Sequence, residues 1–140
     1  MSAAVGQGRR AARRAAVFLL YQHEVTGLPV DELRENARRA GEDVDAFGEE
    51  IVAGVLADRE ALDAEIGAAS QGWEVERIAP LERSILRVAV HEIRSRGDIP
   101  AAVAVNEAVE NAKRYCQADA AGFVNGILGT IARAHGVDEE

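Results

Sequence analysis

The sequence predicts an all-α protein built from two packed three-helix bundles. Apolar residues recur at helical spacing along most of the chain, and no segment shows the alternation of a half-buried strand. Aromatic residues make up only 4% of the 140 residues and there are three prolines, so little interrupts a helical pattern. With 48% hydrophobic residues, the chain is long and apolar enough to form a folded core.

Three helices are expected in the first half, at about residues 9–24, 30–40 and 45–69. The first should end before Gly27 and Pro29, and the second at Gly41. The third is long, and Gly54 lies near its middle, where the helix can bend or a neighbour can approach closely.

The segment GAASQGW at residues 67–73 is the strongest break in the middle of the chain. We therefore divide a single domain at 9–135 into halves at about 9–70 and 75–135, and we expect Trp73 to pack beside the break. Residues 1–8 are expected to form a flexible tail and residues 136–140 a disordered one.

Three more helices are expected in the second half, at about residues 81–96, 101–116 and 119–134. Pro80 suits the first turn of the first of these, and GDIP at 97–100 separates it from the next. Asp119 is a suitable N-cap for the last helix.

The charge distribution is uneven. The formal net charge is −8, yet the first 14 residues hold four arginines and no acidic residue: Arg9, Arg10, Arg13 and Arg14. Salt screens the distant acids within about 8 to 10 Å, so a local basic cluster can still bind phosphates. The cluster is a candidate anion site, and its alternative is a solvated helix start.

Composition narrows the class of protein further. The basic start followed by AAVFLL lacks a small-residue cleavage site, and no stretch approaches the roughly 18 apolar residues of a spanning helix, so we expect no membrane association and a cytoplasmic protein. A lone cysteine, Cys116, excludes an internal disulfide and a cysteine-based zinc site.

The first helix has two distinct sides at 100° per residue. One side carries the core-facing residues Ala12, Ala16, Leu19 and His23. The arginines share the other side and are therefore expected to lie away from the core. Val17 and Tyr21 continue the arginine stripe, which indicates either a less polar second contact for a partner or simple packing under a loop.

Four ordered segments resemble the NusB family of bacterial transcription antitermination factors. They are RRAARRAAVFLLY near the start, LERSILRVAVHEI at 81–93, DIPAAVAVNEAVENAKRY at 98–115 and GFVNGILG at 122–129. The match runs from about Arg9 to Ala134, and VNEAVENAK and FVNGIL are its most specific parts.

The resemblance implies an all-helical fold, no catalysis and no cofactor. It also implies binding of boxA RNA in ribosomal RNA transcripts together with NusE, a small-subunit ribosomal protein, and help for RNA polymerase in passing terminators.

The resemblance also implies site residues. Arg9, Arg10 and Arg13 match the family's arginine-rich helix, and with Arg14 they are the predicted RNA contacts, because guanidinium groups pair well with phosphate. We expect that replacing Arg10 and Arg13 by glutamate abolishes RNA binding without unfolding, since both side chains should be exposed.

Two further pairs follow from the same resemblance. Asp119 and Phe123 match positions near RNA, where Phe123 would either stack on an unpaired base or anchor the last helix in the core. Tyr21 and Glu82 match the side that meets NusE.

Several polar residues interrupt apolar helices in the second half. For Asn106 and Asn125 we favour capping or bridging hydrogen bonds between the last two helices, because buried polar groups need partners. Gly126 is expected to allow close helix packing. Glu107 also has the polar character of a functional residue, while Lys113 and Arg114 are expected on the solvated surface.

The chain departs from the family pattern at three positions. Ala120 and Gly122 replace a common serine and a common basic residue, which removes polar groups from the loop expected to meet RNA. His91 stands where an aromatic residue is common, so the surface there is expected to differ.

The sequence also allows two other classes of function to be compared with RNA binding, an enzyme and a self-associating module. His23, His91 and His135 fall on different helices without metal-ligand spacing, and no glycine-rich loop follows a strand, which disfavours an enzyme. The alternative to the RNA-binding hypothesis is a homodimer that covers the arginine and Tyr21 surface.

Overall fold

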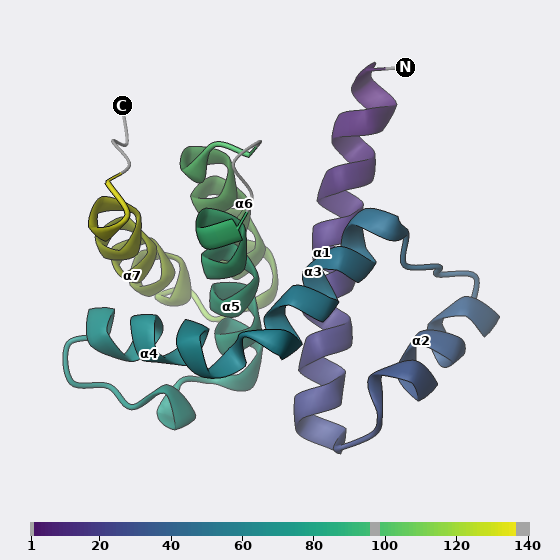
Figure 1. Ribbon diagram of the computed structural model, residues 1–140, viewed down its shortest axis with the longest axis horizontal. Helices are drawn as coiled ribbons and strands as arrows, with labels where there is room; N and C mark the ends of the chain where they lie inside the picture. The colour runs from purple at the N-terminus through teal and green to yellow at the C-terminus, as the bar shows by residue number, and fades with distance from the viewer. Residues whose placement is uncertain (1, 96–98, 137–140) are drawn as a thin grey trace.

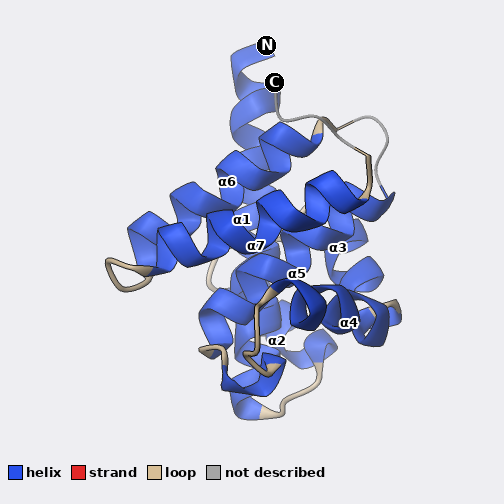
Figure 2. Cartoon of the chain, turned by 90° about the vertical axis from the view of Figure 1, so that its left-hand side faces the viewer, coloured by secondary structure: helices blue, strands red, loops and turns tan. Residues whose placement is uncertain are grey.

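The structure is a computed structural model that describes residues 2–95 and 99–136, with side chains described from residue 8 onward. Within these ranges the chain folds as seven α-helices and one short 3-10 helix (Figure 1). The elements are α1 (Ser2–Thr26), α2 (Val30–Arg39), α3 (Ala46–Ala57), α4 (Arg59–Ala69), η1 (Val75–Arg77), α5 (Pro80–Ser95), α6 (Ala101–Tyr115) and α7 (Ala120–Ala134). No strand occurs in these ranges (Figure 2), and the predicted all-α class is confirmed.

Helix α5 lies at the centre of the arrangement. It packs against α1 and α3 of the first half, against α6 and α7 of the second half, and also against α4. Helices α1, α2 and α3 form the first bundle and α5, α6 and α7 the second, with α4 packed on α5 and α7. The α1 side and the α6–α7 side are therefore held in fixed relation through α5.

The helix boundaries follow ordinary capping chemistry. Pro29 and Pro100 precede α2 and α6, and Pro80 is the first residue of α5, where the missing N–H costs no intrahelical hydrogen bond. At α3 the Asp45 carboxylate accepts a hydrogen bond from the Gly48 amide at 3.0 Å. Gly27 follows α1 with φ +74°, a left-handed conformation that glycine adopts readily.

Two predicted boundaries were wrong. Helix α1 begins at Ser2 instead of about Arg9, so the helix is longer at its start than predicted. The single helix expected at 45–69 is two helices that break at Asp58, whose φ of −112° leaves the helical range. Figure 1 shows α3 and α4 following one another with a change of direction. The expected disorder of residues 137–140 lies outside the described residues.

Gly54 sits where α3 meets α5. A Cβ atom at this position would lie 2.1 Å from Cε1 of His91, so only glycine allows the two helices this approach. His91 is buried, at 6% exposure, and the expectation that it alters the molecular surface was wrong. The close approach expected at Gly54 is therefore confirmed.

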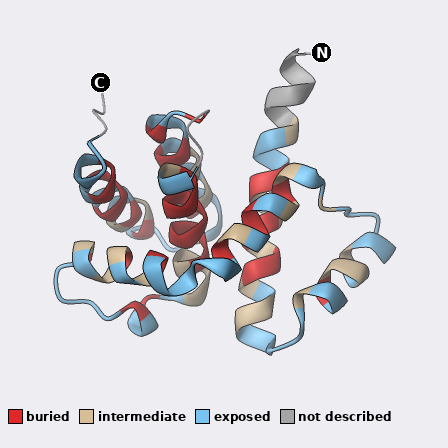
Figure 3. Cartoon of the chain, in the orientation of Figure 1, coloured by how far each residue is buried: buried red, intermediate tan, exposed pale blue. Residues whose placement is uncertain are grey.

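The two bundles share one continuous hydrophobic core (Figure 3). Its largest fully buried apolar side chains come from α3, α4, α5 and α7 and are Ile51, Val52, Val55, Leu62, Ile66, Ile85, Leu86, Val90, Val124 and Leu128. Because α5 contributes to both sides of this core, movement of one bundle against the other would expose apolar surface.

The turn after α4 places Trp73 in an unexpected position. The Ser70 hydroxyl donates to the carbonyl oxygen of Trp73 at 2.7 Å and also lies 3.0 Å from the carbonyl oxygen of Gly67. Gly72 has φ +97°, a left-handed conformation. The Trp73 side chain is 53% exposed. The prediction that the Trp73 side chain packs down beside the break was therefore wrong, because about half of this side chain faces solvent.

No helix in the described part of the chain is long and apolar enough to cross a lipid bilayer.

Candidate nucleic-acid interface

The four N-terminal arginines do not share one environment. Arg9 and Arg10 are exposed, Arg14 is half-buried, and Arg13 is buried at 5% exposure. All four lie on α1, which is packed between α3 and α5 and so has two buried sides instead of one. The helical wheel of a single helix could not show the second side.

Arg13 joins α1 to α5 by a buried ion pair. Its Nε donates to both carboxylate oxygens of Glu92 at 2.9 Å, and the two side chains are 6% and 1% exposed. The expectation that Arg13 is exposed was therefore wrong. A glutamate here would put two carboxylates together in the interior.

Arg9 and Arg10, on the same helix as Arg13, are exposed and present cationic groups to solvent. The Arg9 guanidinium lies 5.0 Å from the centre of the Phe47 ring on α3, within cation–π range. Arg10 Nε donates to Glu107 Oε1 on α6 at 2.9 Å, and the Arg10 side chain remains 69% exposed. Each of these two guanidinium groups has one contact to a neighbouring helix and remains exposed enough for a phosphate to reach it.

The apolar end of the predicted stripe divides between core and surface. Val17 is 3% exposed and belongs to the core, so the interpretation of Val17 as part of a partner surface was wrong. Tyr21 is half-buried. The predicted core residues Ala12, Ala16 and Leu19 are confirmed.

A network of charges fixes the end of α1 that carries Tyr21. Glu24 accepts hydrogen bonds from Arg83 and Arg87 of α5, each at 2.7 Å, and Arg87 also donates to Asp63 of α4 at 2.7 and 2.8 Å. Burial disfavours the Glu24 carboxylate, but the two guanidinium groups outweigh burial and lower its pKa.

Asp119 and Phe123 lie at the start of α7, beside a hollow of about 280 Å³. Glu82 and the exposed Trp73 line the same hollow. Asp119 occupies the N-cap position but makes no side-chain cap hydrogen bond. The structure thus brings Asp119 and Glu82 together, although the family resemblance assigns Asp119 to the RNA surface and Glu82 to the NusE surface.

The carboxylates in this hollow influence each other. Burial raises the pKa of Glu82, and the nearby charge of Asp119 raises it further. Burial and the charge of Glu82 also raise the pKa of the Cys116 thiol, so this cysteine favours the protonated, weakly nucleophilic form.

The Phe123 ring is partly packed in the core and partly exposed to solvent. It is half-buried and packs against the core, and it meets Trp73 edge to face with 6.1 Å between ring centres. A second hollow of about 270 Å³ lies against the same two rings. Trp73 was missed as a surface residue because its exposure depends on the turn at 70–73.

The polar residues of α6 and α7 differ from expectation. Asn106 and Asn125 are exposed and make no hydrogen bond to a described side chain, so the expected bonds between these helices were wrong. A Cβ atom at Gly126 would meet no atom within 4 Å, so close packing does not require glycine there. Glu107 instead links α6 to Arg10 of α1.

The surface at the end of α6 agrees with expectation. Lys113 and Arg114 are exposed, and Lys113 lies 3.7 Å from Glu110. Among the described residues no three His, Cys, Asp or Glu side chains gather in a way that could hold a metal ion.

The arginines and the start of α7 form two separate patches. Glu107, which contacts Arg10, lies on α6, and Asp119 follows the end of that helix. At 1.5 Å per residue, the part of α6 from Glu107 to Tyr115 spans about 12 Å. A single contact cannot join them, but a short stretch of extended polymer can.

Fold and site together define an all-α, two-bundle protein with a cationic helix face suited to a phosphate polymer. The chain belongs to the NusB family, whose family model matches residues 10–133.

Relatives and solved structures agree with this assignment. The transcription antitermination protein NusB of Rubrobacter xylanophilus is 43% identical over 120 residues, which is 86% of each chain. That of Bacillus velezensis is 43% identical over 123 residues, which is 88% of this chain and 94% of the relative.

Structural comparison gives the same fold. T. maritima NusB superposes with a TM-score of 0.82 at 32% identity, covering 91% of this chain and 92% of the other. NusB in a complex of NusB and NusE with double-stranded RNA has a TM-score of 0.78 at 24% identity, covering 91% and 98%, and this likeness shows the shared fold.

Proposed function

We propose that this chain is a transcription antitermination factor that binds boxA RNA of ribosomal RNA transcripts together with NusE and helps RNA polymerase to read through terminators. Membership of the NusB family and relatives named as transcription antitermination proteins support the proposal. It acts without catalysis, in the cytoplasm where transcripts are made.

The observation that carries the proposal is the cationic end of α1 in an acidic chain. Arg9, Arg10 and Arg14 reach the surface at one end of a protein with a net charge of −8. Guanidinium groups stay charged and pair with phosphate through two parallel donors. The Phe47 ring holds Arg9 in place, whereas Arg10 exchanges its Glu107 partner for phosphate when RNA binds.

Arg13 has a different part in this proposal. Its pair with Glu92 is buried and fixes α1 against α5, which positions Arg9, Arg10 and Arg14. We assign Arg13 to positioning and the other three arginines to phosphate contact.

Asp119 and Phe123 form the second proposed RNA contact. The exposed part of the Phe123 ring is available to stack on an unpaired base, and a carboxylate can accept a hydrogen bond from a base amino group. RNA that leaves the arginines along α6 reaches this patch.

Tyr21 and Glu82 form the proposed NusE surface. Tyr21 lies on α1 and Glu82 on α5, and the hydrogen bonds of Glu24 to Arg83 and Arg87 join these two helices. A partner that contacts both residues would therefore meet a rigid surface. Glu82 forms no ion pair with a described side chain, and a cationic group on NusE would supply one. Tyr21→Asp should weaken NusE binding at least tenfold while leaving RNA-only binding unchanged.

The test is binding of the purified protein to fluorescent boxA RNA and to a scrambled RNA, with and without NusE, at two salt concentrations. Selective binding that NusE strengthens is the expected result. Each lost phosphate contact should reduce the slope of log affinity against log salt by about 0.7 for single-stranded RNA.

Arg10→Gln is the informative variant and Arg39→Gln its matched control. Both arginines are exposed, at 69% and 70%, and each pairs with one glutamate, but Arg39 lies on α2. Arg10→Gln should weaken binding and lower the salt slope, and Arg39→Gln should do neither. Equal binding of both RNAs by the wild type, with or without NusE, would reject the proposed function.

A further inference from the structure

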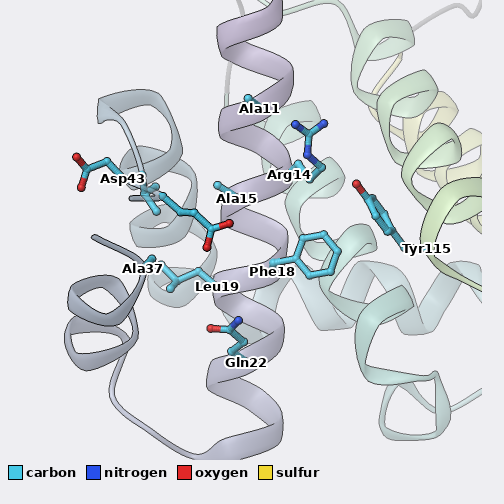
Figure 4. Close-up of a pocket in the computed structure, with 11 residues that line it drawn as sticks. Ala11, Arg14, Ala15, Phe18, Leu19, Gln22, Ala37, Asp43 and Tyr115 are labelled. Carbon is cyan, nitrogen blue, oxygen red and sulfur yellow. The ribbon is translucent and has the colours of Figure 1, made fainter. Parts of the chain in front are cut away.

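A groove of about 520 Å³ runs along α1, beside the proposed RNA path. Figure 4 shows the connection between α2 and α3 on one side of it, and Arg14, Phe18 and Tyr115 on the other. Sites for single small ligands in proteins span about 300 to 1,000 Å³, so the groove is large enough for one nucleotide.

Two aromatic rings form one wall of the groove. Phe18 of α1 and Tyr115 of α6 meet edge to face, with 4.9 Å between ring centres and 87° between ring planes. Tyr115 is 37% exposed despite this contact. Rings fixed by each other offer a rigid surface on which any base can stack.

Arg14 connects the groove to the proposed phosphate contacts. It follows Arg10 by four residues, so both project from the same face of α1. Arg14 forms no ion pair with a described side chain. A phosphate chain that meets Arg10 can therefore meet Arg14 at the next helical turn.

The opposite wall is acidic. Glu42 and Asp43 line it, both are exposed, and neither forms a salt bridge with a described side chain. Asp43 is directed away from α1 in Figure 4 and acts electrostatically on Arg38 of α2. Of these two carboxylates, that of Glu42 is therefore the one available to accept hydrogen bonds from a ligand in the groove.

A carboxylate beside an RNA path repels phosphate and selects among bases. It accepts two adjacent hydrogen bonds from the N1–H and N2–H of guanine. The other three bases present an acceptor beside their single donor group on this edge, which a carboxylate disfavours. An aromatic wall, an arginine and one carboxylate together suit a guanine nucleotide.

We propose that this groove binds one unpaired guanine of the RNA, stacked on the Phe18 and Tyr115 rings, with its N1–H and N2–H donated to Glu42 and its phosphate at Arg14. This inference rests on the proposed RNA-binding function and adds base specificity to it.

Inosine provides the test because it is guanine without the N2 amino group. We would measure fluorescence anisotropy with single-stranded boxA RNAs in which each guanine in turn is replaced by inosine, with NusE present. One position should lose about tenfold in affinity for the wild type, the effect of a lost hydrogen bond to a charged group. In Glu42→Gln the loss at that position should shrink to about twofold or less.

The control is Glu32→Gln, which removes the same charge from an exposed residue of α2 outside the groove. It should keep the full inosine effect. Tyr115→Leu should weaken the guanine RNA by about fivefold or more through lost stacking. Helical circular dichroism of each variant checks that the fold is retained.

The outcomes separate the two proposals. An inosine effect at one position that disappears in Glu42→Gln and persists in Glu32→Gln supports the groove as the guanine site. If the wild type selects boxA RNA but no inosine substitution matters, or the effect persists in Glu42→Gln, the groove proposal is wrong and RNA binding stands. If the wild type does not select boxA RNA, both proposals fail.

Discussion

Replacing Arg13 by methionine should unfold the protein more readily instead of merely weakening RNA binding. Arg13 and Glu92 are 6% and 1% exposed and are joined through both carboxylate oxygens at 2.9 Å. Methionine fills much of the same volume but leaves the Glu92 charge in the interior without this partner.

The size of the effect follows from burial. Removing one member of a buried ion pair costs about 3 to 5 kcal/mol, whereas an exposed pair contributes about 0 to 1 kcal/mol. Arg10, whose side chain is 69% exposed beside Glu107, belongs to the second class. Because folded domains are stable by about 5 to 15 kcal/mol, the Arg13 change removes a large part of the total.

Urea unfolding followed by helical circular dichroism measures the difference. We expect the free energy of unfolding to fall by about 3 kcal/mol or more in Arg13→Met and by less than about 1 kcal/mol in Arg10→Met. Arg13→Met combined with Glu92→Leu should recover part of the loss, because no charge is then buried alone. Equal stability of the two single variants would refute the structural role of Arg13.

Three further predictions follow. Glu107→Gln should strengthen RNA binding by about two- to fivefold, because phosphate no longer competes with Glu107 for Arg10; unchanged affinity in a titration would show that the pair does not restrain Arg10. Gly54→Ala should lower the free energy of unfolding by about 1 to 3 kcal/mol, since the new Cβ lies 2.1 Å from the buried His91 ring; a urea midpoint equal to wild type would contradict this packing. The lowered pKa of Glu24 contributes stability above the unfolded value of about 4.5 that is lost as pH falls through the folded pKa. In Glu24→Gln the protein should be less stable at neutral pH and should lose less stability on acidification, as urea midpoints across pH would show.

Local pattern predicted most of the helices because their determinants are local. Gly27, Pro80 and Pro100 set helix ends through backbone conformation, and the structure places ends beside each of them. The break at Asp58 was missed because apolar spacing continues across it. Its cause is tertiary: α3 packs on α1 whereas α4 packs on α7, so the two helices need different directions.

Exposure of single residues was predicted less well. Trp73 faces solvent because of the turn that Ser70 closes, and Asn106 and Asn125 face solvent because α6 and α7 meet through other residues. These outcomes depend on which helix faces meet, and composition along one helix does not specify that.

By itself the sequence determined an all-α fold, its family and a cluster of four arginines at one end of an acidic chain. Periodicity, turn residues and charge are properties of neighbouring positions, so they can be read along the chain. Only the tertiary structure decided that Arg13 is buried against Glu92 while Arg10 stays at the surface. The physical reason is that α1 lies between α3 and α5, so the environment of each arginine depends on side chains distant in sequence.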